Sequence, residues 1–257
     1  MPATRHLGRA VAFLTPLLPL ALAHGQLRVF SSSHGSWTAA DAYGPSNASS
    51  PIRKVDWYGP ATNFTSPNIT CGEGGNTPVE ALATVSAGEL VTFDWGSWGS
   101  NHSGPVMTYM AQCVNGCATF AGDSGGIWVK IDQDSCNNTY GIIGWGVSSE
   151  DRGKPALHGD HILIPLLYPK ILALHIAATP YGAQFYPNCV QVRVVDGGDV
   201  VLPRGVALPG VYDPNDTLGI LVDLYAIENR GVPFVSPGGP VLLPGGNGSW
   251  GTDVYGA

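Results

Sequence analysis

The sequence predicts an all-β protein, an antiparallel β-sandwich with long loops, on three observations. Charged residues make up only 12% of the chain, and 35 glycines and 21 prolines interrupt it, a composition typical of short strands joined by turns. Several stretches alternate apolar and polar residues with period two, as a strand does when one face meets a core. No long stretch repeats apolar residues at helical spacing. Two packed sheets account for this combination better than a helical fold.

The alternation is clearest in the segments 91–95, 127–131 and 190–194, which we expect to be half-buried antiparallel strands. In each of them the first, third and fifth residues are apolar, and they alternate with residues such as Asp94, Lys130 and Arg193. Glycine, serine, asparagine and proline fill the connections between them. The last segment, 235–257, is rich in glycine and proline and lacks cysteine, so we expect a surface-bound or disordered tail.

The first 23 residues have the features of a secretory signal peptide. Arg5 and Arg9 supply a positive start, Val11 to Leu22 is largely apolar, and the segment ends in Ala21-Leu22-Ala23, a small-x-small cleavage pattern. The apolar run is too short to span a membrane, so an uncleaved anchor is the weaker alternative. We therefore divide the chain into a signal peptide (1–23), a β-sandwich domain (24–234) and a tail (235–257), and we expect a secreted monomer.

Secretion changes the meaning of two other features. The five cysteines are expected to form two disulfides and leave one residue over, because the compartment is oxidising and no CxxC pair indicates a zinc site. Seven sequons fit a glycosylated surface, at Asn47, Asn63, Asn68, Asn101, Asn137, Asn215 and Asn247. The net charge of −7 and the lack of a basic patch argue against nucleic acid and anionic membranes as partners.

Cleavage after Ala23 would leave His24 with a free α-amino group. That amine and the imidazole ring can chelate one metal ion from a single residue, since both nitrogens lose their protons readily. A third nitrogen from another histidine would complete a tetragonal set, which suits Cu(II) better than Zn(II). The cleavage pattern alone does not separate this interpretation from chance placement of a histidine after the signal peptide.

The second nitrogen source is best sought at His102. It lies in Asn101-His102-Ser103-Gly104-Pro105, where the Gly-Pro pair makes a rigid turn that can hold a loop histidine outward from the sandwich edge. The remaining candidates, His34, His158 and His161, are interpreted as ordinary surface histidines.

A third cluster comprises His175 and the run Gln184-Phe185-Tyr186. On a strand Gln184 and Tyr186 point to the same side, and Phe185 points to the core. The Tyr186 hydroxyl can then occupy an axial position on copper, and Gln184 and His175 can hydrogen-bond an oxygen species beside it. The simpler alternative is one exposed strand face with no metal.

Taken together, these motifs resemble Auxiliary Activity family 9, the lytic polysaccharide monooxygenases once filed as glycoside hydrolase family 61. The resemblance runs from His24 to about Gly219 and depends on the order of several motifs rather than on one. They are His24-Gly25, Ile69-Thr70-Cys71, Asn101 to Val106, Trp128 to Ile131, Ala173-Leu174-His175, Gly182 to Cys189 and Leu208 to Tyr212.

The resemblance implies an immunoglobulin-like sandwich with a flat copper-bearing face. It implies His24 and His102 as copper ligands, Tyr186 as the axial residue, and His175 and Gln184 as groups beside the copper. The implied disulfides are Cys71–Cys189 and Cys113–Cys117, which leaves Cys136 over. The implied substrate-binding aromatic residue is Tyr212, with Trp57 and Tyr58 as candidates on the opposite loop.

One segment departs from the family pattern. The family's strand before the equivalent of His175 usually reads Pro-Gly-x-Tyr-Leu-x-Arg-x-Glu, whereas this chain passes from Ile164 to His175 with several residues missing. Pro169 also removes a backbone donor from this strand. We therefore expect a shortened strand, whose register and aim at His175 are open to slippage.

The implied reaction is oxidative cleavage of a β-1,4-glucan such as cellulose at C1 or C4. It uses one copper ion, an external electron donor, and O₂ or H₂O₂ as co-substrate. Three alternatives remain open at this stage: a secreted copper-binding protein without oxygenase activity, a hydrolase with two carboxylates, and a carbohydrate-binding module. No acidic pair lies near the histidine motifs, which disfavours the hydrolase.

Overall fold

The computed structural model describes residues 24–96, 98, 102–135, 137–139, 142–144, 165–197 and 202–241. The predicted signal peptide, Cys136, and the sequons at Asn101 and Asn247 lie outside these residues. The elements in chain order are β1 Val29–Ser32, β2 Gly35–Thr38, α1 Asn68–Cys71, β3 Ala83–Ser86, β4 Thr92–Asp94, β5 Val106–Gln112, a 3₁₀ turn Cys117–Thr119, β6 Gly126–Asp134, β7 Asn137–Thr139, β8 Ile142–Gly144, β9 Pro165–Ala173, β10 Gln184–Pro187, β11 Val190–Val195, β12 Val206–Ala207 and α2 Leu224–Arg230.

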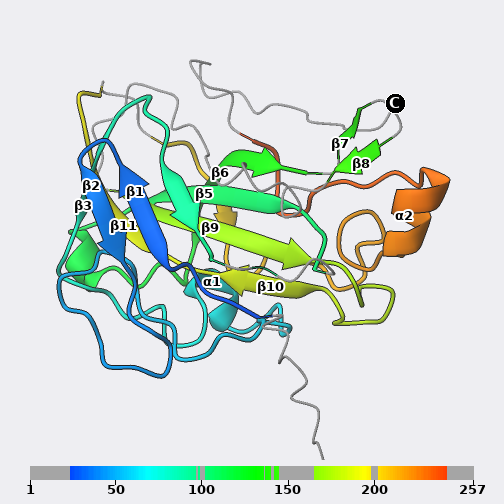
Figure 1. Ribbon diagram of the computed structural model, residues 1–257, viewed down its shortest axis with the longest axis horizontal. Coiled ribbons are helices and arrows are strands. Elements are labelled where there is room, and N and C mark those ends of the chain that lie inside the picture. The colour runs from blue at the N-terminus through cyan, green and yellow to red at the C-terminus, as the bar shows by residue number, and fades with distance from the viewer. Residues whose placement is uncertain are drawn as a thin grey trace, which may run out of the picture.

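Two sheets confirm the predicted β-sandwich (Figure 1). The smaller sheet has the order β2-β1-β4, and the larger has the order β12-β6-β5-β9-β11-β3, with β10 paired to β9. All pairs are antiparallel except β11 with β3, and a short β7–β8 hairpin stands apart. The three strands predicted from alternation correspond to β4, β6 and β11.

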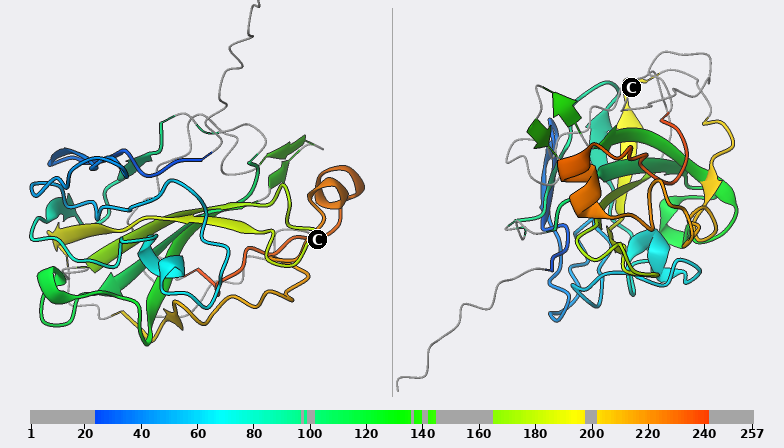
Figure 2. Two further views of the ribbon diagram at one scale, coloured as in Figure 1. Left: turned by 90° about the horizontal axis from the view of Figure 1, so that it is seen from below. Right: turned by 90° about the vertical axis from the view of Figure 1, so that its right-hand side faces the viewer.

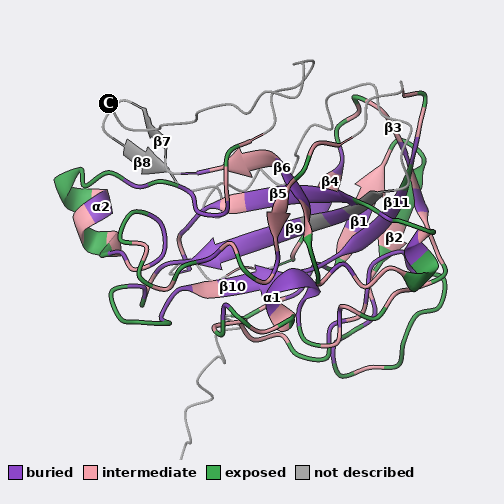
Figure 3. Ribbon diagram, turned by 180° about the vertical axis from the view of Figure 1, so that it is seen from behind, coloured by how far each residue is buried: buried purple, intermediate pink, exposed green. Residues whose placement is uncertain are grey.

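Both faces of the larger sheet are covered, as the two side views show (Figure 2). One face packs against the smaller sheet through apolar side chains that include Phe30, Phe93, Met110 and Val192. The other face packs against α1 and the C-terminal segment, through a second cluster that includes Trp128 and Phe185. The central strands β5, β9 and β11 are therefore buried over most of their length (Figure 3).

Coverage of both faces corrects one expectation for β6 and one for β11. Trp128 and Lys130, expected on a solvent face, are both buried. The Trp128 indole donates to the carbonyl of Gly122, and the Lys130 ammonium donates to that of Pro237. In β11 the side chain of Gln191 is buried and accepts a hydrogen bond from Arg53. The alternation of apolar and polar residues located the strands correctly. It did not reveal that Trp128, Lys130 and Gln191, on the polar faces of β6 and β11, are covered by other segments.

The two expected disulfides are present, Cys71–Cys189 and Cys113–Cys117. The first joins α1 to the residue before β11 across 118 positions, and the second closes a short loop after β5. Cys71 and Cys189 are fully buried, so this bridge lies within the core beneath the segment that leads into β11.

The predicted boundary at residue 234 is placed too early. Ser236 is buried and donates to the Ser135 hydroxyl, and the carbonyl of Gly238 accepts from the Tyr109 hydroxyl. Glycine at 238 is required because a Cβ there would lie 2.1 Å from that hydroxyl oxygen. The sandwich domain therefore includes residues 236–238, and only the segment after them remains a candidate tail.

Tyr212 does not lie on the surface, which corrects its assignment as a substrate-binding residue. Its side chain is only 6% exposed and its ring packs against Phe185, with centroids 4.6 Å apart. The ammonium of Lys170 lies 3.7 Å from the ring centroid, and the Tyr212 hydroxyl hydrogen-bonds that of Tyr109. Packing of the C-terminal segment over β5 and β9 holds the ring inside.

We predict that Tyr212→Ala lowers the free energy of unfolding by about 3–5 kcal/mol, because it empties a large buried site. Tyr212→Phe keeps the ring and loses one hydroxyl contact, at about 1 kcal/mol. Chemical denaturation measures both. The control is Trp57→Ala, whose side chain is 52% exposed, with an expected change within about 0.5 kcal/mol. Equal stability of Tyr212→Ala and the parent would contradict the buried placement.

Candidate metal centre

The candidate site forms where β9 ends and β10 begins. Antiparallel pairing places Gln184 opposite Ala173 and Tyr186 opposite Ile171, so both polar residues lie beside the end of β9. His175 follows that strand by two residues. The strand is nine residues long and pairs with β5 from Pro165 to Ile171, so its register towards His175 is defined. Pro169 lies opposite Thr108 in this pairing, and its carbonyl accepts from the backbone N–H of Asn188.

The loop before β5 is tied to the same strand. The backbone N–H of Leu174 donates to Ser103, and that of Leu172 donates to Pro105. Gly104 lies between these bonds, and a Cβ there would be only 1.8 Å from the carbonyl oxygen of Leu172, so only glycine permits the approach. His102 is thereby directed inward and is 3% exposed, which corrects the expectation that the turn holds it outward.

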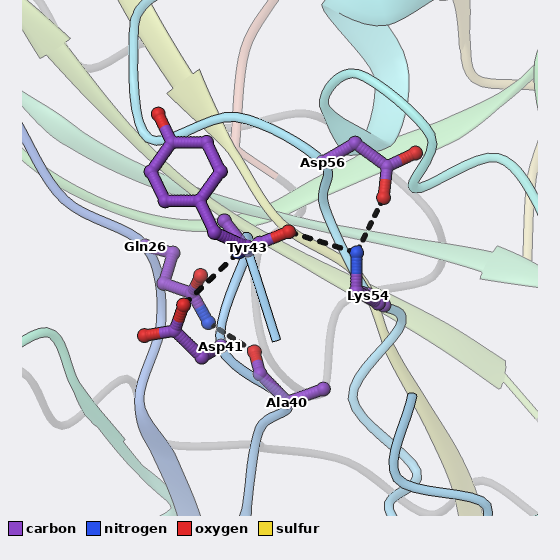
Figure 4. Close-up of polar contacts among 7 residues, drawn as sticks. Gln26, Ala40, Asp41, Tyr43, Lys54 and Asp56 are labelled. Carbon is purple, nitrogen blue, oxygen red and sulfur yellow. Dashed lines mark hydrogen bonds and ion pairs between the residues drawn. The ribbon is translucent and has the colours of Figure 1, made fainter. Parts of the chain in front are cut away.

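The beginning of the described chain is anchored beside β10. The Gln26 amide donates to the carbonyl of Ala40 at 2.6 Å, as the close-up shows (Figure 4). The backbone N–H of Leu27 donates to the Asn188 side chain at 3.2 Å, and Leu27 itself is fully buried. These bonds hold the residues directly after His24, whose own side chain is exposed.

Three rings meet at this point. The centroids of His24 and His102 are 5.9 Å apart and the rings are nearly perpendicular, at 87°. The Tyr186 ring lies 6.0 Å from His24 and 6.3 Å from His102. Since a metal–imidazole bond is roughly 2.0–2.1 Å long, two imidazoles on opposite sides of one ion place their centroids roughly 6 Å apart. The observed spacing therefore fits a single ion between the two histidines.

Burial sets the protonation states that such a site requires. Desolvation, assisted by the charges of His175 and His24, lowers the pKa of His102 to about 4, so its ring is neutral at physiological pH. Desolvation also lowers the pKa of His175 and raises that of Tyr186, so the phenol keeps its proton. A neutral imidazole and a neutral phenol are the forms in which these groups serve as an equatorial and an axial ligand.

Two further groups surround the rings. The His175 ring lies against that of His102, with centroids 4.1 Å apart and the planes tilted by 41°, and its buried Nδ1 has no hydrogen-bond partner. The Tyr186 hydroxyl donates to Oε1 of Gln184 at 2.9 Å. That bond occupies the acceptor side of the amide, so the Nε2 group is the end of Gln184 left to donate to another molecule.

Sequence analysis missed Trp98. It treated Trp95 only as a strand residue and did not connect Trp98, four positions before His102, with the histidine. In the structure the Trp98 ring lies 4.9 Å from that of Tyr186 and 5.9 Å from that of His102. The available signal was the pair of tryptophans in Trp95-Gly96-Ser97-Trp98, directly before the histidine loop.

The other predicted substrate-binding residues lie on the loop that follows β2. Trp57 is 52% exposed and lines a shallow pocket together with Gly25 and Tyr186. Tyr58 donates its hydroxyl to Asp41 and meets the ring of Tyr43 edge-on, at 4.9 Å. Tyr43 is 72% exposed, and sequence analysis did not select it. Of the predicted sequons whose side chains are described, Asn47, Asn63 and Asn215 are exposed, and Asn68 is half-buried.

Within the described part of the chain, no group of three histidine, cysteine, aspartate or glutamate side chains is arranged to hold a metal ion. The histidine rings that face each other across the candidate centre are those of His24 and His102, and His175 lies against His102. No helix among the described residues is long and apolar enough to cross a membrane.

The fold and these rings define a β-sandwich with a candidate mononuclear metal centre at one end of the larger sheet. Comparison with known proteins places it in a family. The model of Auxiliary Activity family 9 (formerly GH61) matches residues 24–231, and the chain belongs to this family of copper-dependent oxidoreductases.

Relatives named as AA9 family lytic polysaccharide monooxygenases agree with this family assignment. The chain is 35% identical over 249 residues to AA9 family lytic polysaccharide monooxygenase C of Aspergillus fumigatus, covering 91% of this chain and 67% of that one. It is 36% identical to lytic polysaccharide monooxygenase F of Botryotinia fuckeliana, covering 74% and 79%. Against lytic polysaccharide monooxygenase A of A. fumigatus it spans only 61% of the relative's length.

Solved structures show the same fold. HiLPMO9B superposes with a TM-score of 0.72 at 29% identity, covering 85% of this chain and 99% of the other. The extended catalytic domain of H. jecorina LPMO9A gives a TM-score of 0.75 at 23% identity, covering 91% and 97%.

We predict that the metal-free protein loses stability as the pH falls from about 6.5 towards about 4. The folded pKa of His102 is depressed, so the unfolded chain binds more protons across this window. Between pH 7 and pH 5 the loss due to this residue is about 1–2 kcal/mol. Urea unfolding at both pH values measures it. The exposed His34 is the control: His34→Gln should retain the full pH dependence, and His102→Gln should lose part of it.

Proposed function

We propose that the chain is a secreted monooxygenase that cleaves cellulose or a related β-1,4-glucan oxidatively at C1, C4 or both, using one copper ion held by His24 and His102. The observation that carries the proposal is the meeting of the His24, His102 and Tyr186 rings within 5.9–6.3 Å. Family membership supports the copper chemistry and a polysaccharide substrate.

The residues that would hold the copper ion are His24, through its imidazole and α-amino group, and His102, through its imidazole, with the Tyr186 phenol beside them. This set requires removal of residues 1–23, which we infer to be a signal peptide. Copper, reduced by an external donor, supplies the activation of O₂ or H₂O₂ when it is bound. The protein's part is to hold the His102 imidazole neutral and fixed before the ion arrives, which burial of His102 accomplishes.

Gln184 and His175 complete the site. Since the Tyr186 hydroxyl occupies Oε1 of Gln184, the amide Nε2 is set to donate to an oxygen co-substrate on the same side of the strand. His175 packs against His102 at a centroid distance of 4.1 Å and restricts the movement of that ring. Two polar groups placed beside a metal centre have a use in oxygen chemistry that mere copper storage does not have.

The glucan is expected to lie across the exposed aromatic side chains near His24. Trp57 is the leading candidate for stacking on a sugar ring, because it is half-exposed and shares a pocket with Gly25. Tyr58 takes part through its bond to Asp41, which fixes the loop. The protein acts alone, as a monomer with a reductant as its only other partner.

We predict that one extra residue before His24 abolishes tight copper binding. The extension converts the α-amine into an amide, which does not readily ligate, and leaves only two imidazoles. Isothermal titration calorimetry measures affinity and stoichiometry for the extended protein and for the form that begins at His24. Equal affinity in the two forms would contradict the proposed ligand set.

We predict that Gln184→Leu still binds one copper per chain but releases oxidised oligosaccharides from cellulose roughly ten- to a hundredfold more slowly. The change removes one hydrogen bond to a charged or strongly polar oxygen group, at about 1.5–3 kcal/mol. Product formation with ascorbate is measured beside copper stoichiometry.

The matched control is Gln112→Leu, an exposed glutamine at the far end of β5, which should cleave at the parent rate. If Gln184→Leu also cleaves at the parent rate, its assignment is wrong. If the parent binds copper and never cleaves, the protein is a copper carrier rather than an oxygenase.

A further inference from the structure

Trp98 lies outside the proposed ligand set and contacts every segment that bears a proposed ligand. Its indole Nε1 donates to the carbonyl of His102 at 3.4 Å, and its ring meets those of His102 and Tyr186 edge-on. Its six-membered ring also covers Gly25, where a Cβ would lie 3.4 Å from Cζ3 and 3.6 Å from Cε3. Three separate parts of the chain therefore converge on one indole.

The contact with Gly25 has particular weight because His24 is exposed. A chain end frays unless packing or hydrogen bonds hold it. Gln26 and Leu27 are anchored by hydrogen bonds, and between them and His24 the side chain of Trp98 lies over Gly25, nearest to where its Cβ would be. Orientation of the His24 ring towards His102 therefore depends on a contact that the indole makes.

Trp98 is itself supported. Trp95 meets it edge-on at 6.0 Å, and the two tryptophans pack against a small apolar cluster of Ile171, Ala173 and Tyr186. Since Ile171 and Ala173 belong to β9, the indole packs against the same strand that positions His175. A rigid wall of this kind holds functional groups within the narrow tolerance that a metal site needs.

We propose that Trp98 is a positioning residue for the copper site, which locks the N-terminal segment and the His102 loop against Tyr186 so that both histidines are arranged before copper binds. The proposal rests on the proposed function of His24 and His102 as copper ligands. Trp98 itself touches neither the ion nor the substrate in this role.

The test compares Trp98→Ala and Trp98→Phe with the parent, all processed to begin at His24. Copper affinity is measured by competitive calorimetry, and the Cu(II) site by its electron paramagnetic resonance spectrum. We expect affinity to fall at least tenfold in Trp98→Ala and about threefold in Trp98→Phe, with a changed copper hyperfine splitting in both. Phenylalanine lacks the indole N–H group and is too short to cover Gly25 in the same way. If Trp98→Ala fails to fold, the phenylalanine variant still decides the test.

Trp37→Phe is the matched control, because Trp37 stacks on Phe30 in the smaller sheet. It should change the melting temperature by a comparable amount and leave both copper readouts unchanged. Parent-like affinity and spectrum in both Trp98 variants would overturn the proposal. Equal losses in Trp37→Phe would do the same, because they would show a general effect of destabilisation.

A metal-free measurement separates this proposal from the proposed function. In the parent, the Gly25 α-proton resonances should be displaced to high field by the ring current of the indole, and they should return to ordinary values in Trp98→Ala. A parent that binds no copper refutes the copper function. Even then the Gly25 α-proton chemical shifts of the parent test the ordering role of Trp98. Resonances displaced to high field support that role, and resonances at ordinary values refute it.

Discussion

The register of β9 between β5 and β10 is the constraint on which the candidate centre depends. Val106 and Gln184 pair with residues two positions apart on β9, Ile171 and Ala173, so the loop of His102 and the start of β10 are fixed to one end of one strand. A slip of one residue would turn Gln184 and Tyr186 to the opposite face. Burial on both sides of β9 makes such a slip costly, because the core residues Leu167, Leu172 and Lys170 would all change sides.

The same burial that fixes the register also sets the chemistry. His102 and Tyr186 lie at the inner boundary of the site, and desolvation keeps the imidazole deprotonated and the phenol protonated. Desolvation is the largest cause of both pKa shifts, with a smaller contribution to that of His102 from the charges of His175 and His24, and the Tyr186 ring is packed among aromatic and aliphatic neighbours. The packing at this end of the sheet therefore also sets the protonation states that His102 and Tyr186 need in order to bind a metal ion.

Much of this could be predicted from the sequence, for identifiable reasons. The alternation of apolar and polar residues predicts strands β4, β6 and β11. The cleavage pattern directly before His24 points to that histidine. The burial of Tyr212, Lys130 and Gln191 could not be predicted, because it depends on segment 236–238 and on the stretches around Arg53 and Val79, which fold over the larger sheet from distant parts of the chain. Local patterns report which face of a strand is apolar and do not report whether something covers the polar face. Trp98 was missed for the same reason, since its partners are near it in space but lie as far apart in sequence as Gly25 and Tyr186.

The proposed ligands differ in exposure, and this difference indicates how the site is assembled. His102 is 3% exposed and Tyr186 is 1% exposed, so the sheet fixes both without help from a metal. His24 is exposed and belongs to a chain end, so it is the ligand whose order costs the most conformational entropy. Whatever restrains Gly25 reduces that cost before the ion binds, and affinity then reflects the anchoring of residues 25–27 as much as the ligands themselves. A site built in this way is open on its solvent side and rigid on its inner side, as the proposed reaction on a polysaccharide requires.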